Sequence, residues 1–304
     1  MSPARQPTNI AASVRARLLE VSRRRNAEFQ QILSEFAIER LLYRLGISPH
    51  AERFVLKGAM LFKVWSERPN RPTWDLDLLG RGASAVPDVI TVIRDLCLIA
   101  VDDGIIFART SIEGEEIRAA DEYAGVRVHL EALLAEAQIP MQVDVEFGDT
   151  IVPDPIKQSY PTLLDHSPPI ILMYPREAVI GEKIEAMVSL GVTNSRMKDF
   201  YDVCLLASSF PFEGTSLTRA IYETFKRRGT PLPDSEPLVL TREFLAAPER
   251  QTQWRAFLRR GRLDAPPDAG KLAEILRGFL KPVLQAAAHG EEFASRWPAG
   301  GPWR

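Results

Sequence analysis

The stretch WDLDLL, at residues 74–79, limits the possible folds of this chain more than any other. Side chains of a β-strand alternate between its two faces, so Asp75 and Asp77 share one face and the leucines at 76 and 78 share the other. Two carboxylates so close repel each other unless a metal ion or a basic group lies beside them. The pattern therefore predicts a half-buried strand that carries either a two-carboxylate site or a solvated acidic edge.

The sequence on either side of this strand predicts a mixed α/β sheet. FVLKG at residues 54–58 is typical of a short buried strand, and the AMLFKVWSE that follows is typical of a helix. Further on, IPMQVDVEFGD alternates so that Asp144 and Glu146 fall on one face of a later strand. Residues 12–45 repeat apolar side chains every three or four positions, which predicts helical structure that stops at Gly46.

Prolines divide the chain into parts. Five of them between residues 149 and 169 predict a loop or linker rather than an element of secondary structure. Beyond this segment the pattern is helical, apart from the proline-rich TPLPDSEP. We therefore expect an N-terminal helical segment at 1–50, an α/β core at 51–170 and a helical C-terminal domain at 171–304.

Composition excludes several classes of protein. With 304 residues, 45% of them hydrophobic, the chain can bury a large core without disulfides. Its two cysteines lie in apolar runs, which indicates reduced thiols, and no stretch approaches the roughly 20 apolar residues of a membrane span. We therefore expect a cytoplasmic protein without a membrane span. The net charge of -2 means that binding to nucleic acid would need a local basic patch.

Later segments offer partners for the two aspartates. Mg²⁺ prefers oxygen ligands and is usually held by a few carboxylates together with substrate phosphates, so either Asp144 or Glu146 could be a third carboxylate. Lys183, in GEKIEAMVSL, could neutralise a triphosphate. Asp199, in SRMKDFYDV, could orient that amine or accept a proton. Taken singly, each of these residues could equally belong to a surface ion pair.

Taken in order, these segments resemble those of a known family. KG after the first strand, then RPTWDLDLL, VDVEFGD, EKIEAMV and SRMKDFYDV are similar to the motifs of the AbiEii/AbiGii-type nucleotidyltransferase toxins, in the DNA polymerase β-like superfamily. The resemblance covers roughly residues 50–210. It implies a polymerase-β-like mixed sheet with flanking helices and a helical C-terminal region. It also implies a Mg²⁺-dependent enzyme that transfers a nucleotide from a nucleoside triphosphate (NTP) to an RNA such as tRNA, and a cognate antitoxin.

The resemblance assigns nucleotide-binding roles near the first strand. The glycine pair of the family falls on Gly58 and Ala59, and the Thr of its TxDxD motif falls on Thr73. Relatives often have Gly or Ser at the second position. Because Ala59 has no hydroxyl, phosphate contacts there would come from backbone N–H groups at Gly58 or from Lys57. The resemblance further implies that Thr73 lies at the active site, where a kinase-like antitoxin can phosphorylate it.

The resemblance also assigns catalytic roles. It implies that Asp75 and Asp77 bind the metal and the nucleotide phosphates, with Asp144 as the preferred third metal ligand. The lysine of the family's later helix falls on Lys183, which would bind the triphosphate. The KDxxD segment begins at Lys198, and its first aspartate, Asp199, would orient Lys183 or act as a base. The second aspartate of that segment, Asp202, is expected to be an ion-pair partner of Arg196 or Lys198.

Other functions stay open at this point. The same fold could add a nucleotide to a small molecule such as an aminoglycoside, or bind a nucleotide without turnover, for which the departure at Ala59 is the only support. The arginine-rich segments VRARLLEVSRRR, FKRRG and WRAFLRRGR could each be a solvated helix face. An RNA acceptor, however, would need such cationic contacts for its backbone.

Overall fold

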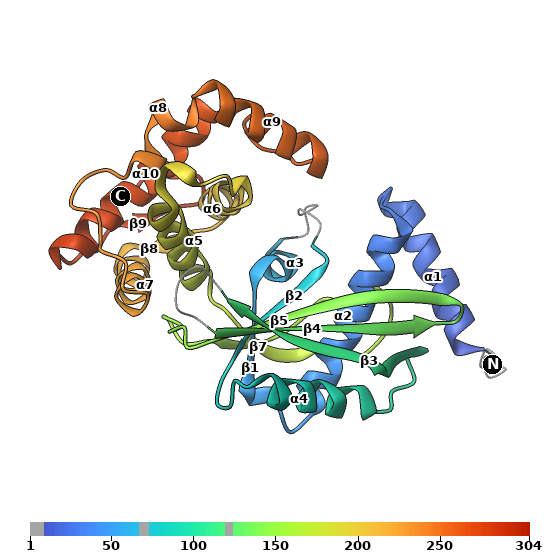
Figure 1. Ribbon diagram of the computed structural model, residues 1–304. Coiled ribbons are helices and arrows are strands. Elements are labelled where there is room, and N and C mark those ends of the chain that lie inside the picture. The colour runs from blue at the N-terminus through green and yellow to red at the C-terminus, as the bar shows by residue number, and fades with distance from the viewer. Residues whose placement is uncertain (1–8, 67–72, 119–123) are drawn as a thin grey trace. The chain divides into compact units, whose positions relative to one another are not determined.

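The structure, a computed structural model, describes residues 9–66, 73–118 and 124–304. The chain divides into two compact units, both visible in Figure 1. The first comprises Met1–Gly148 and Ile156–Met173, and the second comprises Asp149–Pro155 and Tyr174–Arg304. The residues predicted to form a separate N-terminal helical segment therefore belong to the unit that contains the sheet.

Within the described residues, a mixed seven-stranded sheet forms the centre of the first unit (Figure 1). Its strands are β1 (Phe54–Lys57), β2 (Asp75–Gly80), β3 (Ile105–Arg118), β4 (Ala124–Leu134), β5 (Ala137–Phe147), β6 (Ile156–Ser159) and β7 (Ile170–Met173). They follow the order β3-β4-β5-β2-β1-β7-β6. β2 pairs in parallel with β5 and antiparallel with β1, which in turn pairs in parallel with β7. The other neighbours pair antiparallel.

The alternation predicted for the central strands is confirmed. Leu76 and Leu78 on β2 are buried, as are Val143 and Val145 on β5, whereas the acids between them are only partly covered. Helix α2 contacts β5 and β7, and α4 contacts β3 and β4. The helices of this unit are α1 (Ile10–Arg25), α2 (Phe29–Ile47), α3 (Phe62–Trp65) and α4 (Val86–Leu98), with 3₁₀ turns η1 (Ala51–Arg53) and η2 (Gly58–Leu61).

The N-terminal helical structure ends within one residue of the predicted stop at Gly46. It is divided at Asn26, which adopts the left-handed conformation that closes α1. α2 then continues through Gly46 to Ile47. A Cβ at Gly46 would collide with the backbone oxygen of Ile170, so this glycine permits close packing of α2 against the start of β7.

The segment 149–169 is not entirely a loop, contrary to the prediction. Within it, β6 pairs antiparallel with β7 from Ile156 to Ser159. The prolines flank this strand and do not interrupt it, and it lies at the edge of the sheet, where proline-rich surroundings are tolerated.

The second unit is largely helical, as predicted. α5 packs against α7, and α10 packs against α6, α7 and α8. Phe279 on α10 contacts the rings of Phe212, Trp297 and Trp303. Among the described residues, no helix has the length and apolar character needed to cross a membrane. The elements are α5 (Arg176–Leu190), η3 (Gly191–Thr193), α6 (Met197–Ser209), β8 (Phe212–Glu213), α7 (Gly214–Arg227), η4 (Leu238–Leu240), α8 (Arg242–Leu245), α9 (Pro248–Gly261), α10 (Ala269–His289) and β9 (Arg296–Trp297).

Candidate functional site

Charged residues of four neighbouring strands form one row across the sheet of the first unit. Lys57 on β1 is in register with Asp77 on β2, and Asp77 is in register with Asp144 on β5. Asp144 is in turn in register with Arg127 on β4. This charge row has a cation at each end and two carboxylates in the middle. Like charges directly opposite each other on neighbouring strands destabilise a sheet, so the arrangement needs the two basic residues or another cation.

Lys57 neutralises one side of the charge row. Its Nζ lies 2.6 Å from Oε2 of Glu146, and its side chain is only 7% exposed. Burial raises the pKa of Asp77 to about 6, against the opposing effect of Lys57. The nearby carboxylates of Glu146, Asp144 and Asp75 also contribute to this raised value. Asp77 therefore lies in surroundings where an added cation would be strongly favourable.

Gly58 is fitted to Asp77. Its φ angle of +73° lies in the left-handed region that favours glycine, and a Cβ built on it would overlap the Asp77 carboxylate. The turn from β1 into η2 thus brings backbone directly against the acid. Ala59, the position at which the chain departs from the family, is buried next to it. The Gly58 of the predicted motif is therefore explained by close approach to Asp77.

Arg127 and Gln142 hold the carboxylate of Asp144. Arg127 donates from Nε to Oδ1 at 2.9 Å and from Nη2 to Oδ2 at 2.7 Å. Gln142 Nε2 donates to the same two oxygens at 3.2 and 3.1 Å. Of the two carboxylates considered for the third position, Asp144 is the one in register with Asp77, whereas Glu146 is paired with Lys57.

Asp75 and Thr73 lie at the start of β2. Asp75 is in register with Gln142 and lies two residues before Asp77 on β2, so it shares the face of Asp77. Thr73 is partly buried, and its Oγ1 lies 3.5 Å from the backbone oxygen of Asp75. The structure therefore brings the first-unit candidates together around β2.

Lys183 and Asp199 form a separate cluster in the second unit. Lys183 Nζ lies 2.8 Å from Oδ1 of Asp199 and 2.7 Å from Oδ2 of Asp202. Both aspartates are at most 1% exposed. Arg196 contributes a further ion pair to Asp199 at 2.7 Å. Asp202, expected to pair with Arg196 or Lys198, thus pairs with Lys183.

Electrostatics keep Asp199 ionised. Burial raises the pKa of its carboxyl, but Lys183 and Arg196 outweigh burial, and the net result is a pKa below the ordinary value. An ionised, buried Asp199 fixes the position of the Lys183 amine. This geometry fits the orienting role predicted for Asp199 better than a role as proton acceptor, because a carboxylate with a lowered pKa is a weak base.

Comparison with known proteins identifies the family. Residues 40–286 match the sequence profile described as "Nucleotidyl transferase AbiEii toxin, Type IV TA system". The chain belongs to the AbiEii family. No curated protein sequence is significantly similar to it.

Two solved structures from Helicobacter pylori have a related arrangement. One is JHP933, with a TM-score of 0.46, and the other, with a TM-score of 0.45, is a protein provisionally assigned as a nucleotidyltransferase. Both are 14% identical to this chain. The alignments cover 86% of this chain and 95% and 98% of the two other chains, respectively.

The AbiEii family resemblance implies a divalent cation, and the donors on β2 suit one. In the part of the chain that the structure describes, no three His, Cys, Asp or Glu side chains are grouped to hold a metal ion. One reason is that Arg127 takes both oxygens of Asp144. Mg²⁺ nevertheless needs only one or two carboxylates where substrate phosphates supply the other oxygens. Asp75 and Asp77 fit a cation that arrives with a nucleotide.

Sequence reasoning missed Arg127 and Gln142. The alternation in VRVHLE places Arg127 on the polar face of a strand, and this signal was present in the sequence. Its pairing with Asp144, however, depends on the register between β4 and β5. That register is set by a short turn in which Ala135 has a φ of +51°. An alanine at this position does not predict such a conformation.

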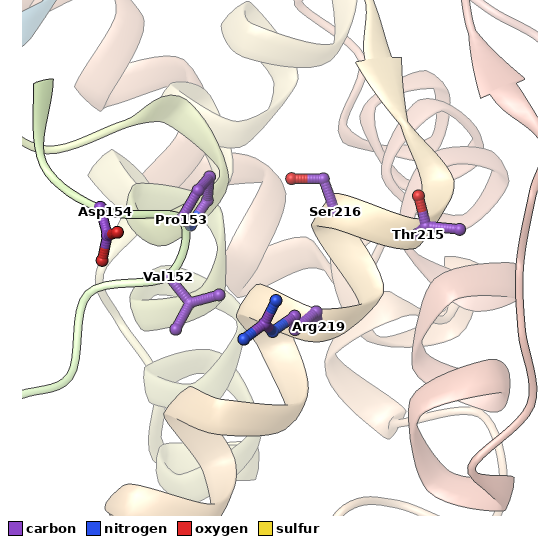
Figure 2. Close-up of a pocket in the computed structure, with 6 residues that line it drawn as sticks. All are labelled: Val152, Pro153, Asp154, Thr215, Ser216 and Arg219. Atoms are coloured by element: carbon purple, nitrogen blue, oxygen red, sulfur yellow. The ribbon is translucent and has the colours of Figure 1, made fainter.

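A pocket of about 370 Å³ lies inside the second unit (Figure 2). It is formed by the segment around Pro153 and by the first turns of α7. No predicted site residue of this AbiEii chain lines it, so it contributes nothing to the candidate site. Its lining residues are Val152, Pro153, Asp154, Thr215, Ser216 and Arg219.

Proposed function

We propose that this AbiEii-family toxin transfers a nucleoside monophosphate from an NTP to an RNA acceptor such as a tRNA. The observation that supports the proposal most is the placement of Asp75 and Asp77 on one sheet face, with Asp144 in register beside Asp77. Three carboxylates on adjacent strands would repel one another without a cation, and nucleotidyl transfer is a reaction in which a metal ion and phosphates meet.

In this proposal Asp75 and Asp77 hold Mg²⁺. The bound ion would polarise the phosphate and lower the pKa of the attacking hydroxyl. Lys57 balances the charge row from the β1 side, and the backbone at Gly58 lies directly against Asp77. Lys57 and the backbone N–H of Gly58 have the proposed role of binding the nucleotide phosphates.

Lys183 has the proposed role of binding the triphosphate. Two buried carboxylates hold its amine in a fixed position. Asp199 orients Lys183 through the 2.8 Å ion pair and acts as a positioning residue. Thr73, beside Asp75, is the proposed site at which an antitoxin blocks the enzyme by phosphorylation.

Exposed arginines support an RNA acceptor over a small molecule. Arg255 and Arg259 lie four residues apart on α9 and therefore share a helix face, and both are exposed, as is Arg260. Guanidinium groups in such an array bind successive phosphates of a nucleic acid backbone. A small-molecule acceptor has no phosphate backbone for these arginines to bind.

The proposal places the protein in the cytoplasm, where NTP and RNA are available, with a cognate antitoxin that restrains it. Overexpression in a bacterial host tests this directly. Wild-type protein should arrest growth, and Asp75→Ala should not. Circular dichroism should show that the Asp75→Ala protein is folded. Asp88→Ala, which removes an exposed acid from the first turn of α4, is the matched control and should remain toxic. Full toxicity of Asp75→Ala would overturn the proposal.

A further inference from the structure

Arg127 holds Asp144 through two hydrogen bonds on the charge row. Both carboxylate oxygens accept a hydrogen bond from the guanidinium, in the two-pronged geometry that is the strongest arrangement for such a pair. The side chain of Asp144 is 14% exposed and that of Arg127 is 33% exposed. The acid is therefore largely covered, while the arginine still reaches solvent.

This grip conflicts with metal binding by Asp144. A carboxylate oxygen that ligates Mg²⁺ at about 2 Å cannot keep a straight, short hydrogen bond to an arginine occupying the same lone pairs. Gln142 also donates to both oxygens, which leaves little room for another partner. A guanidinium and a metal ion thus compete for one carboxylate.

Release of Arg127 is feasible because of where it lies. Its next neighbour in register, Glu115 on β3, has an exposed side chain that offers the freed guanidinium an alternative acid. Asp144, by contrast, stays in register with Asp77 whatever Arg127 does, because the backbone pairing of β2 and β5 fixes it. Only the arginine has to move.

We infer that Arg127 is a positioning residue that competes with a cation for Asp144 and so weakens cation binding at Asp75 and Asp77. This inference rests on the proposed function, since it concerns the same cation. While Arg127 holds Asp144, only Asp75 and Asp77 would be available to a cation. If Arg127 were displaced, Asp144 would be available as a third carboxylate, and a cation would bind more tightly.

Binding of Mn²⁺ alone tests the inference without any measurement of activity. Free Mn²⁺ is counted by its electron paramagnetic resonance signal during titration of the purified full chain. Arg127→Gln should bind Mn²⁺ about tenfold more tightly than the wild type, because the competitor for Asp144 is gone. Adding Asp144→Asn to Arg127→Gln should remove this gain. Arg127→Lys, which keeps the charge but loses the two-pronged fork, should fall between the two.

Controls separate competition from general charge effects and from misfolding. Arg94→Gln removes one positive charge from an exposed position on α4 and should leave Mn²⁺ affinity unchanged. Thermal unfolding verifies that each variant is folded. If Arg127→Gln does not fold, Arg127→Lys replaces it in the comparison with the wild type. Asp75→Asn should weaken Mn²⁺ binding in every background.

The outcomes distinguish the inference from the proposed function. Mn²⁺ binding that needs Asp75 but is unchanged by Arg127→Gln would overturn the inference and leave the proposed function standing. A gain of equal size with and without Asp144 would overturn it as well. Absence of any binding that depends on Asp75, in the wild type and in Arg127→Gln alike, would contradict both.

Discussion

Asp77 and Asp144 occupy the same register on adjacent parallel strands, so two carboxylates face one side of the sheet as direct neighbours. Lys57 and Arg127 flank them at the same level on the next strands out. The four charges of this row sum to zero, but the two neighbouring carboxylates repel each other, which lowers the stability of the sheet. We propose that a multivalent cation relieves the repulsion between these two acids.

The close fit between Gly58 and Asp77 predicts an asymmetry between two glycine substitutions. Gly58→Ala should destabilise the protein by roughly 3 kcal/mol, since it combines a positive φ with overlap of the Asp77 carboxylate. Gly82→Ala shares the positive φ, but a Cβ there meets nothing within 4 Å, so roughly 1 kcal/mol is expected. Unfolding in urea measures both. Equal losses would mean that the carboxylate yields freely.

The buried cluster around Lys183 predicts a large stability effect. Lys183→Ala would leave Asp199 and Asp202 without their shared lysine, and the free energy of unfolding should fall by about 3 kcal/mol. Lys198→Ala removes a neighbouring lysine that is exposed, and the change should stay within about 0.5 kcal/mol. Chemical denaturation of both variants provides the comparison. Similar, small losses would show that the cluster is not structurally important.

Glu39, on α2, predicts a pH dependence. Burial raises its pKa from 4.5 to about 7, although the Leu163 N–H and Arg40 favour the ionised form. Because the folded pKa exceeds the unfolded one, the ionised carboxylate destabilises the fold above pH 7, and this cost fades as the pH falls toward 4.5. Glu39→Gln keeps an acceptor for Leu163 and should be more stable than the wild type by roughly 2 kcal/mol at pH 8.

The same comparison at low pH provides the check. At pH 4.5 the wild-type carboxyl is protonated in the folded state and about half protonated in the unfolded chain, so most of the advantage of Glu39→Gln should have vanished. Urea unfolding of both proteins at pH 4.5, 6 and 8 measures the difference. A gap that stays constant over this range would contradict the raised pKa.

Strand patterns were predictable because period-two alternation is local. WDLDLL and VDVEF each fix which side chains share a face, and the structure confirms the buried half of each strand. The helical second unit followed from apolar spacing in the same way. β6 was missed because it forms by pairing with β7, a strand that lies beyond the following loop, and no local pattern indicates that pairing.

The acids and the lysines of the candidate site were predictable from the sequence, but Arg127 was not. Asp75, Asp77 and Asp144 stand out because charged residues interrupt apolar strands. That Asp77 and Asp144 are in register depends on which strands become neighbours, and no local pattern determines this. Arg127 was missed for the same reason, since its partner lies 17 positions away across a turn.

The most direct test of the account is nucleotide transfer by Asp77→Asn. Wild-type protein and Asp77→Asn are each incubated with Mg²⁺, total tRNA and each α-labelled NTP in turn, beside Glu116→Gln, which changes an exposed acid of the same sheet. We expect the wild type and Glu116→Gln to label RNA with a particular NTP, and Asp77→Asn to be slower by at least about a hundredfold. Equal labelling of RNA by Asp77→Asn and the wild type would contradict the assignment of the β2 carboxylates as the catalytic centre.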